Sequence, residues 1–105
     1  MYNLFEAKAS QQAEGNIGFA VHTNTAGLSG FTRESEGMYR ATLPAGITVE
    51  QDDFFFFITN GQTNGRITAY MDDSTVVISS YNPAGELSDS IIDNATIKLK
   101  FNMYE

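Results

Sequence analysis

Apolar and polar side chains alternate with a period of two along most of the chain, and this pattern predicts β-strands. Near the C-terminal end, Ile97, Leu99 and Phe101 alternate with Lys98 and Lys100, as expected for a strand that buries one of its faces. Further strands of this kind are expected at residues 17–22, 38–43, 66–71 and 75–81. No segment of useful length shows the apolar stripe of an amphipathic helix.

Turn residues divide the expected strands. Asp72-Asp73-Ser74 separates two β-prone runs and predicts a hairpin. Asn60-Gly61 and Asn64-Gly65 favour positive φ angles, so the stretch from Thr59 to Gly65 is expected to be a loop between strands. Residues 83–94 are expected to form a long connection with a turn near residues 90–92.

The run Phe54-Phe55-Phe56-Phe57-Ile58 breaks the alternation. Apolar side chains on both faces predict a strand in the centre of a sheet, covered on one side by the core and on the other by a second layer or another subunit. Four consecutive phenylalanines cannot all face one core, so Phe54, Phe55, Phe56 and Phe57 are candidate interface residues. A loop or the N-terminal arm covering them within one chain is the alternative.

These elements predict an all-β fold. About seven or eight short strands, separated by Gly and Asn turns, are typical of an antiparallel β-sandwich of jelly-roll-like type. The length of 105 residues suits one domain over residues 1–105. Residues 1–14 are expected to form either an N-terminal arm or an edge strand.

Charge and composition exclude several kinds of partner. Thirteen acidic against six scattered basic residues give a net charge of −7, which argues against nucleic acid. No stretch is long and apolar enough for a membrane span. The chain has no cysteine to staple a small domain, so burial against neighbouring subunits is expected to contribute to stability. The start of the chain lacks the pattern of a signal peptide.

Candidate catalytic and metal-binding groups are sparse. His22 is the only histidine, and without cysteine or a second histidine it cannot complete a zinc site. No Gly-x-Ser-x-Gly motif is present. Acidic residues occur at Asp52-Asp53, Asp72-Asp73, Asp89 and Asp93; they are interpreted as turn residues, and a weak calcium site among them is left open. We therefore predict no enzymatic activity, no catalytic residues and no cofactor.

Tyrosines in the expected strands offer one further binding chemistry. Tyr39, Tyr70 and Tyr81 are candidates for stacking on sugar rings. The alternative is that these strand tyrosines pack at sheet edges or between subunits.

The order of motifs in residues 28–105 resembles a known family of proteins. These motifs are Gly37-Met38-Tyr39-Arg40-Ala41-Thr42-Leu43, the loop from Tyr81-Asn82-Pro83 through Gly85 to Asp89, and the last strand from Asn94 to Phe101. The chain is similar to the β-rich domains of virion fibre and tail proteins from tailed bacteriophages. No long fibrous stem precedes these motifs, which favours a fibre head, a tail or baseplate accessory protein, or a capsid decoration protein.

The resemblance implies a non-enzymatic assembly protein of the virion, synthesised in the cytoplasm of the bacterial host. It implies a homo-oligomer, with a trimer favoured, that contacts other virion proteins and could contact a glycan of the host surface. The competing hypothesis is a carbohydrate-binding module of a bacterial surface or polysaccharide-utilising system. A second rival is an enzyme accessory subunit with an acidic rim.

Overall fold

The computed structural model describes residues 2–11, 17–47, 49–59 and 65–102. Within them lie eight β-strands and two short 3-10 helices, η2 (Gln51–Asp53) and η3 (Asp89–Ile92). The strands are β1 (Tyr2–Gln11), β2 (Ile17–Asn24), β3 (Thr32–Ser35), β4 (Met38–Thr42), β5 (Phe54–Thr59), β6 (Arg66–Asp72), β7 (Thr75–Tyr81) and β8 (Thr96–Asn102).

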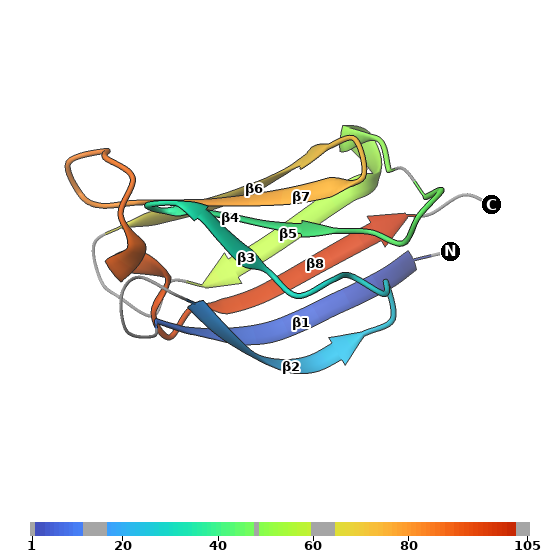
Figure 1. Ribbon diagram of the computed structural model, residues 1–105, viewed down its shortest axis with the longest axis horizontal. Coiled ribbons are helices and arrows are strands. Elements are labelled where there is room, and N and C mark those ends of the chain that lie inside the picture. The colour runs from blue at the N-terminus through green and yellow to red at the C-terminus, as the bar shows by residue number, and fades with distance from the viewer. Residues whose placement is uncertain (1, 12–16, 48, 60–64, 103–105) are drawn as a thin grey trace.

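The strands form two antiparallel four-stranded sheets that pack face to face (Figure 1). The strand order is β2-β1-β8-β5 in the first sheet and β3-β4-β7-β6 in the second. Hairpins join β1 to β2, β3 to β4 and β6 to β7, and the other connections cross between the sheets. The predicted all-β, antiparallel sandwich is confirmed.

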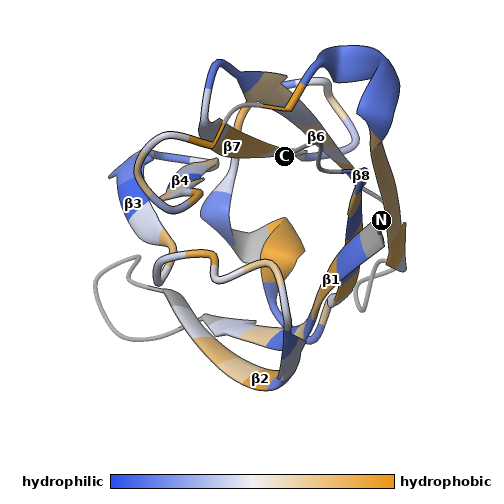
Figure 2. Cartoon of the chain, turned by 90° about the vertical axis from the view of Figure 1, so that its right-hand side faces the viewer, coloured by the Kyte–Doolittle hydropathy of each residue, from blue (hydrophilic) through white to orange (hydrophobic). Residues whose placement is uncertain are grey.

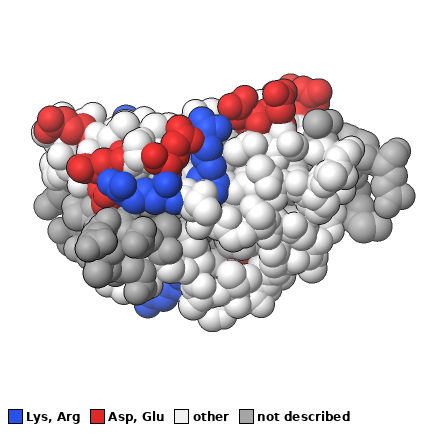
Figure 3. Space-filling view, in the orientation of Figure 1, with Lys and Arg blue, Asp and Glu red and all other residues white. Residues whose placement is uncertain are grey.

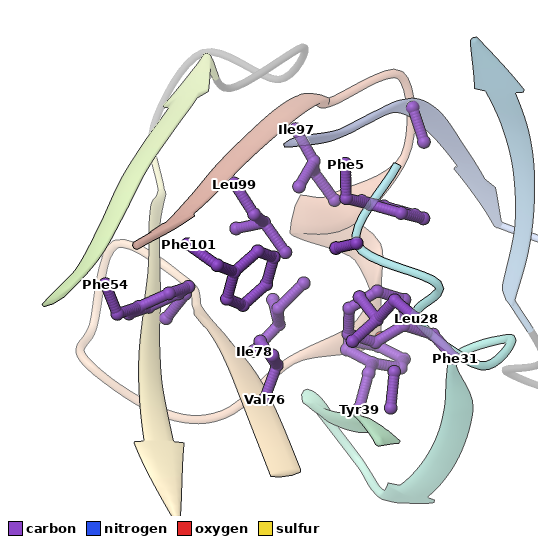
Figure 4. Packing of buried hydrophobic residues seen from close by; sticks show 14 of the residues in the cluster. Phe5, Leu28, Phe31, Tyr39, Phe54, Val76, Ile78, Ile97, Leu99 and Phe101 are labelled. Carbon is purple, nitrogen blue, oxygen red and sulfur yellow. The ribbon is translucent and has the colours of Figure 1, made fainter. Parts of the chain in front are cut away.

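Alternation along the strands builds a single core between the sheets. In β8, Ile97, Leu99 and Phe101 are buried while the lysines between them face outward. From the opposite sheet, Val76 and Ile78 of β7 point into the same space (Figure 4). An end-on view shows the strands of both sheets around this common interior (Figure 2).

The hairpin predicted around Asp72-Asp73-Ser74 is confirmed, since β6 and β7 pair in continuous register from Arg66 opposite Tyr81 to Asp72 opposite Thr75. Asp73 adopts a φ of 55° in this turn, a conformation that Asp tolerates better than most residues. Most of the loop expected from Thr59 to Gly65 lies outside the described residues.

Two predicted positions are wrong. The first strand, β1, lies inside its sheet between β2 and β8, so this part of residues 1–14 is neither an arm nor an edge strand. The phenylalanine strand, β5, lies at the edge of its sheet and pairs with β8 alone among the described strands. Phe55 and Phe57 on its outer face are exposed, so among the described residues no second layer covers this face.

Candidate interaction surface

The β5 edge separates the four candidate interface phenylalanines into one core residue and three surface residues. Phe54 is buried and packs on Phe101, with ring centroids 5.3 Å apart. Phe55, Phe56 and Phe57 are 49%, 43% and 63% exposed. Phe54 is therefore removed from the candidate interface, because its side chain completes the core between the sheets.

The three exposed rings occupy both faces of β5. Phe55 and Phe57 lie opposite Lys100 and Lys98 on the outer face of the sheet. Phe56 lies opposite the core residue Leu99, and it is exposed because β5 is the last strand of the sheet. An inner-face position at an edge leaves such a ring only half covered.

A shallow groove runs beside these rings on the outer face of the sheet. It has a volume of about 230 Å³ and is bordered by Phe55, Phe57 and the two lysines of β8, with Leu4 and Glu6 of β1 at its far side. Lysine stems can cover apolar surface while their ammonium groups stay in water. The groove therefore offers an apolar floor with basic groups beside it.

Charged side chains are unevenly distributed on the surface. On the face shown in Figure 3 they lie mainly along the upper border, and a broad area below carries neither sign. The charged side chains of this face therefore gather mainly in one band.

The candidate sugar-stacking tyrosines do not form one platform. Tyr39 is fully buried and points into the core (Figure 4), so its proposed stacking role is wrong. The ring of Tyr81 is half-buried, and the Arg66 guanidinium carbon lies 4.7 Å from its centroid, a cation–π contact. Tyr70 is 41% exposed and is the one candidate with a largely open side chain.

Tyr39 belongs instead to a buried polar cluster around Asp89. Its hydroxyl donates to Asp89 Oδ1 over 2.6 Å, and the Gly37 N–H donates to the same oxygen over 2.8 Å. Arg33 donates from Nε over 3.0 Å and from Nη2 over 2.9 Å to Oδ2. The cluster ties η3 to the β3–β4 hairpin, and we call it the Asp89 cluster.

The Asp89 cluster shifts the pKa values of its three ionisable side chains, and the hydrogen bond to Asp89 raises that of Arg33. Burial raises the pKa of Asp89, but the hydrogen bonds from Arg33, the Gly37 N–H and Tyr39 outweigh this effect and hold it below 3.8. Burial and the hydrogen bond to Asp89 raise the pKa of Tyr39. These shifts favour an ionised Asp89 carboxylate that is held by the neutral phenol of Tyr39 and the guanidinium of Arg33.

Gly37 is required at this corner for two reasons. Its φ of 75° lies in the left-handed region, and a Cβ atom there would lie 2.6 Å from the Ser88 backbone nitrogen and 2.8 Å from the Ser80 carbonyl oxygen. Only glycine allows this approach. The fold thus brings Gly37 and Tyr39 to Asp89, which lies 52 and 50 residues away along the chain.

Sequence reasoning did not find the Asp89 cluster. Arg33 and Gly37 received no chemical role, and Asp89 was interpreted only as one of several turn acids. Asp89 lies 56 residues from Arg33 and 50 from Tyr39 along the chain, so no local spacing links them. The one available signal was Gly37, because glycine next to a strand favours a tight turn with positive φ.

The remaining acidic residues and His22 do not converge. His22 is exposed on β2. Asp72 pairs with Arg40 over 3.4 Å, and Asp53 accepts a hydrogen bond from Asn102 over 3.3 Å. Among the described residues, no group of three or more His, Cys, Asp or Glu side chains is arranged to hold a metal ion.

Comparison with known proteins leaves the surface as the main functional observation. No protein family, curated protein or solved structure matches this chain. In the part of the chain that the structure describes, no helix has the length and apolar character needed to cross a membrane. Among the surface features of the described residues, the exposed aromatic edge at β5 is the most prominent.

Proposed function

We propose that this β-sandwich is a non-enzymatic assembly protein that acts through protein–protein contact, and that the edge formed by β5 is its contact surface. The observation that carries the proposal is the exposure of three aromatic rings on one edge strand, with Phe55 and Phe57 on its outer face and Phe56 on its inner face. The largest exposed apolar patch of a domain is often a binding site. Aromatic side chains also dominate the binding energy of protein interfaces.

The composition of the groove supports a protein partner. Aromatic rings next to Lys98 and Lys100 provide a central apolar anchor with charged groups at its rim, which is the usual organisation of a protein interface. Tyr70 and Tyr81 lie on the other sheet, and the guanidinium of Arg66 already lies over Tyr81. The competing role in carbohydrate binding therefore rests on Tyr70 alone.

The biological setting that we propose is the virion of a tailed bacteriophage, as a fibre head, a tail or baseplate accessory, or a capsid decoration protein. The support for this setting is the sequence resemblance in residues 28–105, together with a sandwich of a size suited to such a component. Capsid, portal or tail genes beside its gene would support the setting, and polysaccharide-degradation genes would favour the carbohydrate-binding alternative.

Site-specific photo-crosslinking tests the contact. A benzophenone amino acid replaces Phe57 in one variant and the exposed Tyr70 in a matched control, and each variant is produced in the organism that naturally makes the protein. We expect irradiation to give a covalent adduct with a protein chain, identified by mass spectrometry, from position 57 and not from position 70. No adduct at 57, or equal adducts at both positions, would contradict the proposed contact surface.

A further inference from the structure

The two sheets have four edge strands, and three of them carry features that discourage pairing with another chain. The register between β2 and its neighbour shifts between Glu6 and Ala7. The four-residue strand β3 has a register shift and carries Arg33 and Glu34. Strand β6 has a charged residue at each end. Bulges, short length and charges are the usual protection of exposed edges.

Strand β5 has none of these features. Its sequence, Phe-Phe-Phe-Phe-Ile-Thr, contains no charge and no proline, and its register with β8 is continuous over all six residues. Phe57 is the most exposed large apolar side chain among the described residues. A regular, uncharged aromatic edge of six residues is a template for pairing with another strand.

We propose that the occupant of this edge is a second copy of the chain. The two β5 strands pair antiparallel about a twofold axis near Phe56, and the two four-stranded sheets become one continuous eight-stranded sheet. This inference rests on the proposed function, since it names the partner of the same surface.

Self-pairing matches the side chains of β5 to one another. A twofold axis at Phe56 places Phe55 opposite Phe57 of the second copy on the outer face, and Phe54 opposite Ile58 of the second copy on the inner face. Directly opposed residues of an antiparallel pair share a face, and aromatic cross-strand pairs stabilise sheets. In this register every residue from 54 to 58 meets an apolar residue.

The lysines closest to β5 do not oppose this arrangement. Lys98 and Lys100 lie on β8, one strand inward from β5, so the lysines of the two copies are separated by three strand spacings, about 14 Å. This separation exceeds the screening length of about 8 Å at physiological ionic strength. Glu6 lies opposite Lys98 on the next strand and offsets its charge further.

A dimer fits the edges better than the trimer that the bacteriophage resemblance implies. A twofold contact uses the same surface on both copies, whereas a trimeric ring needs a second, different surface that receives β5. The other three edges carry the protective features described above. Because β5 is the one edge among the described strands without such features, a closed dimer is favoured over a trimeric ring.

The size of the aromatic patch sets the expected strength. Each of the three rings leaves about half of its surface exposed, which amounts to roughly 300 Å² per copy for side chains of this size. A stable interface of standard size buries about 800 Å² per partner. We therefore expect a reversible dimer that forms at high protein concentration, with a dissociation constant of roughly micromolar order or weaker.

Analytical ultracentrifugation over a concentration series tests the pair. The wild-type protein is expected to pass from monomer to dimer, and Phe57→Lys is expected to weaken the dimer at least about tenfold, because a charge on the edge must be buried against an aromatic strand. Val21→Lys is the matched control, since Val21 is 51% exposed on β2, the opposite edge of the same sheet. We expect it to leave dimerisation unchanged.

A cysteine cross-link tests the register without requiring a charged substitution. The chain has no native cysteine, so Phe56→Cys introduces a single thiol that faces its own copy across the twofold axis. Directly opposed Cβ atoms lie about 4.5–5.5 Å apart, close to the spacing of about 3.5–4.5 Å in disulfides. Mild oxidation is expected to yield a covalent dimer from Phe56→Cys and far less from Val21→Cys.

A monomer at every concentration, a trimer, a dimer that Phe57→Lys leaves intact, or equal cross-linking of both cysteine variants would each overturn the self-pairing. These failures are distinguishable from failure of the proposed function. If the purified protein stays monomeric but position 57 cross-links to a different protein in the producing organism, β5 remains the contact surface and only its occupant changes. If position 57 gives no adduct with any protein, both proposals fall.

Discussion

The Asp89 cluster and the β5 edge show opposite relations between a side chain and its surroundings. In the Asp89 cluster, a carboxylate whose side chain is only 11% exposed accepts hydrogen bonds from a phenol, a backbone N–H and a guanidinium. At the β5 edge, apolar rings that would gain free energy by leaving water remain 43–63% exposed. The polar groups of the cluster have hydrogen-bond partners within the chain, whereas the rings of the β5 edge keep much of their surface in water.

This difference separates structural roles from binding roles. A buried polar group with complete hydrogen bonding is explained by the fold that it holds together. An exposed aromatic strand is not explained by the stability of the monomer, because hiding it elsewhere would stabilise the chain. Asp89, Tyr39 and Arg33 therefore contribute to the stability of the fold. The surface proposed to contact a partner is the β5 edge.

The largest expected effect lies within β5 itself. Phe54→Ala should reduce the free energy of unfolding by about 3–5 kcal/mol, since truncation of a buried phenylalanine removes its burial and leaves a cavity. Phe57→Ala, at the 63% exposed position, should change it by less than about 0.5 kcal/mol. Urea unfolding measures both, at protein concentrations low enough to keep the chains monomeric. Equal effects would mean that the division of β5 into core and surface is wrong.

The next effect concerns the Asp89 cluster. Asp89→Ala should destabilise the fold by roughly 2–4 kcal/mol, because the Tyr39 hydroxyl and the Gly37 N–H lose their acceptor in a buried site and the more exposed Arg33 loses its ion pair. Asp72→Ala is the matched control: this carboxylate is 56% exposed and pairs with Arg40 over 3.4 Å, so we expect less than about 1 kcal/mol. Thermal and urea unfolding give both values. If Asp89→Ala lowers the free energy of unfolding no more than Asp72→Ala, the Asp89 cluster does not stabilise the fold as proposed.

The smallest expected effect is a dependence on pH. The pKa of Asp89 is held below 3.8 in the folded protein, so its contribution to stability is present above its unfolded pKa and is lost as the pH falls through the folded pKa. Wild type should therefore exceed Asp89→Asn in stability at neutral pH, and the difference should shrink below about pH 4. Urea unfolding of both proteins across this range measures the difference. A gap that stays constant with pH would show that the carboxylate charge contributes nothing.

Much of the fold was predictable because it depends on local pattern. The alternation of Ile97, Leu99 and Phe101 with lysines predicted both the strand and its buried face, since successive strand side chains point to opposite faces. The Asp-Ser turn predicted the β6–β7 hairpin, because turn residues act over a few positions of the chain. These features need no knowledge of the rest of the molecule.

Position within the sheet was not predictable in the same way. An all-apolar strand satisfies the requirements of a central strand, and the sequence of β5 contains nothing to indicate that one side stays open. The assignment of β1 as an arm or edge strand failed for the same reason. Whether a strand is central depends on which other strands pair with it, and that is decided by long-range packing.

The sequence by itself determined the all-β class, the alternation of the strands and the surplus of phenylalanine that must meet something apolar. Only the tertiary structure decided which phenylalanine enters the core, which three remain on the surface, and that Arg33, Gly37 and Tyr39 converge on Asp89. Strand identity is set by neighbouring residues, whereas burial, edge position and polar contacts are set by segments that meet only when the two sheets close on each other.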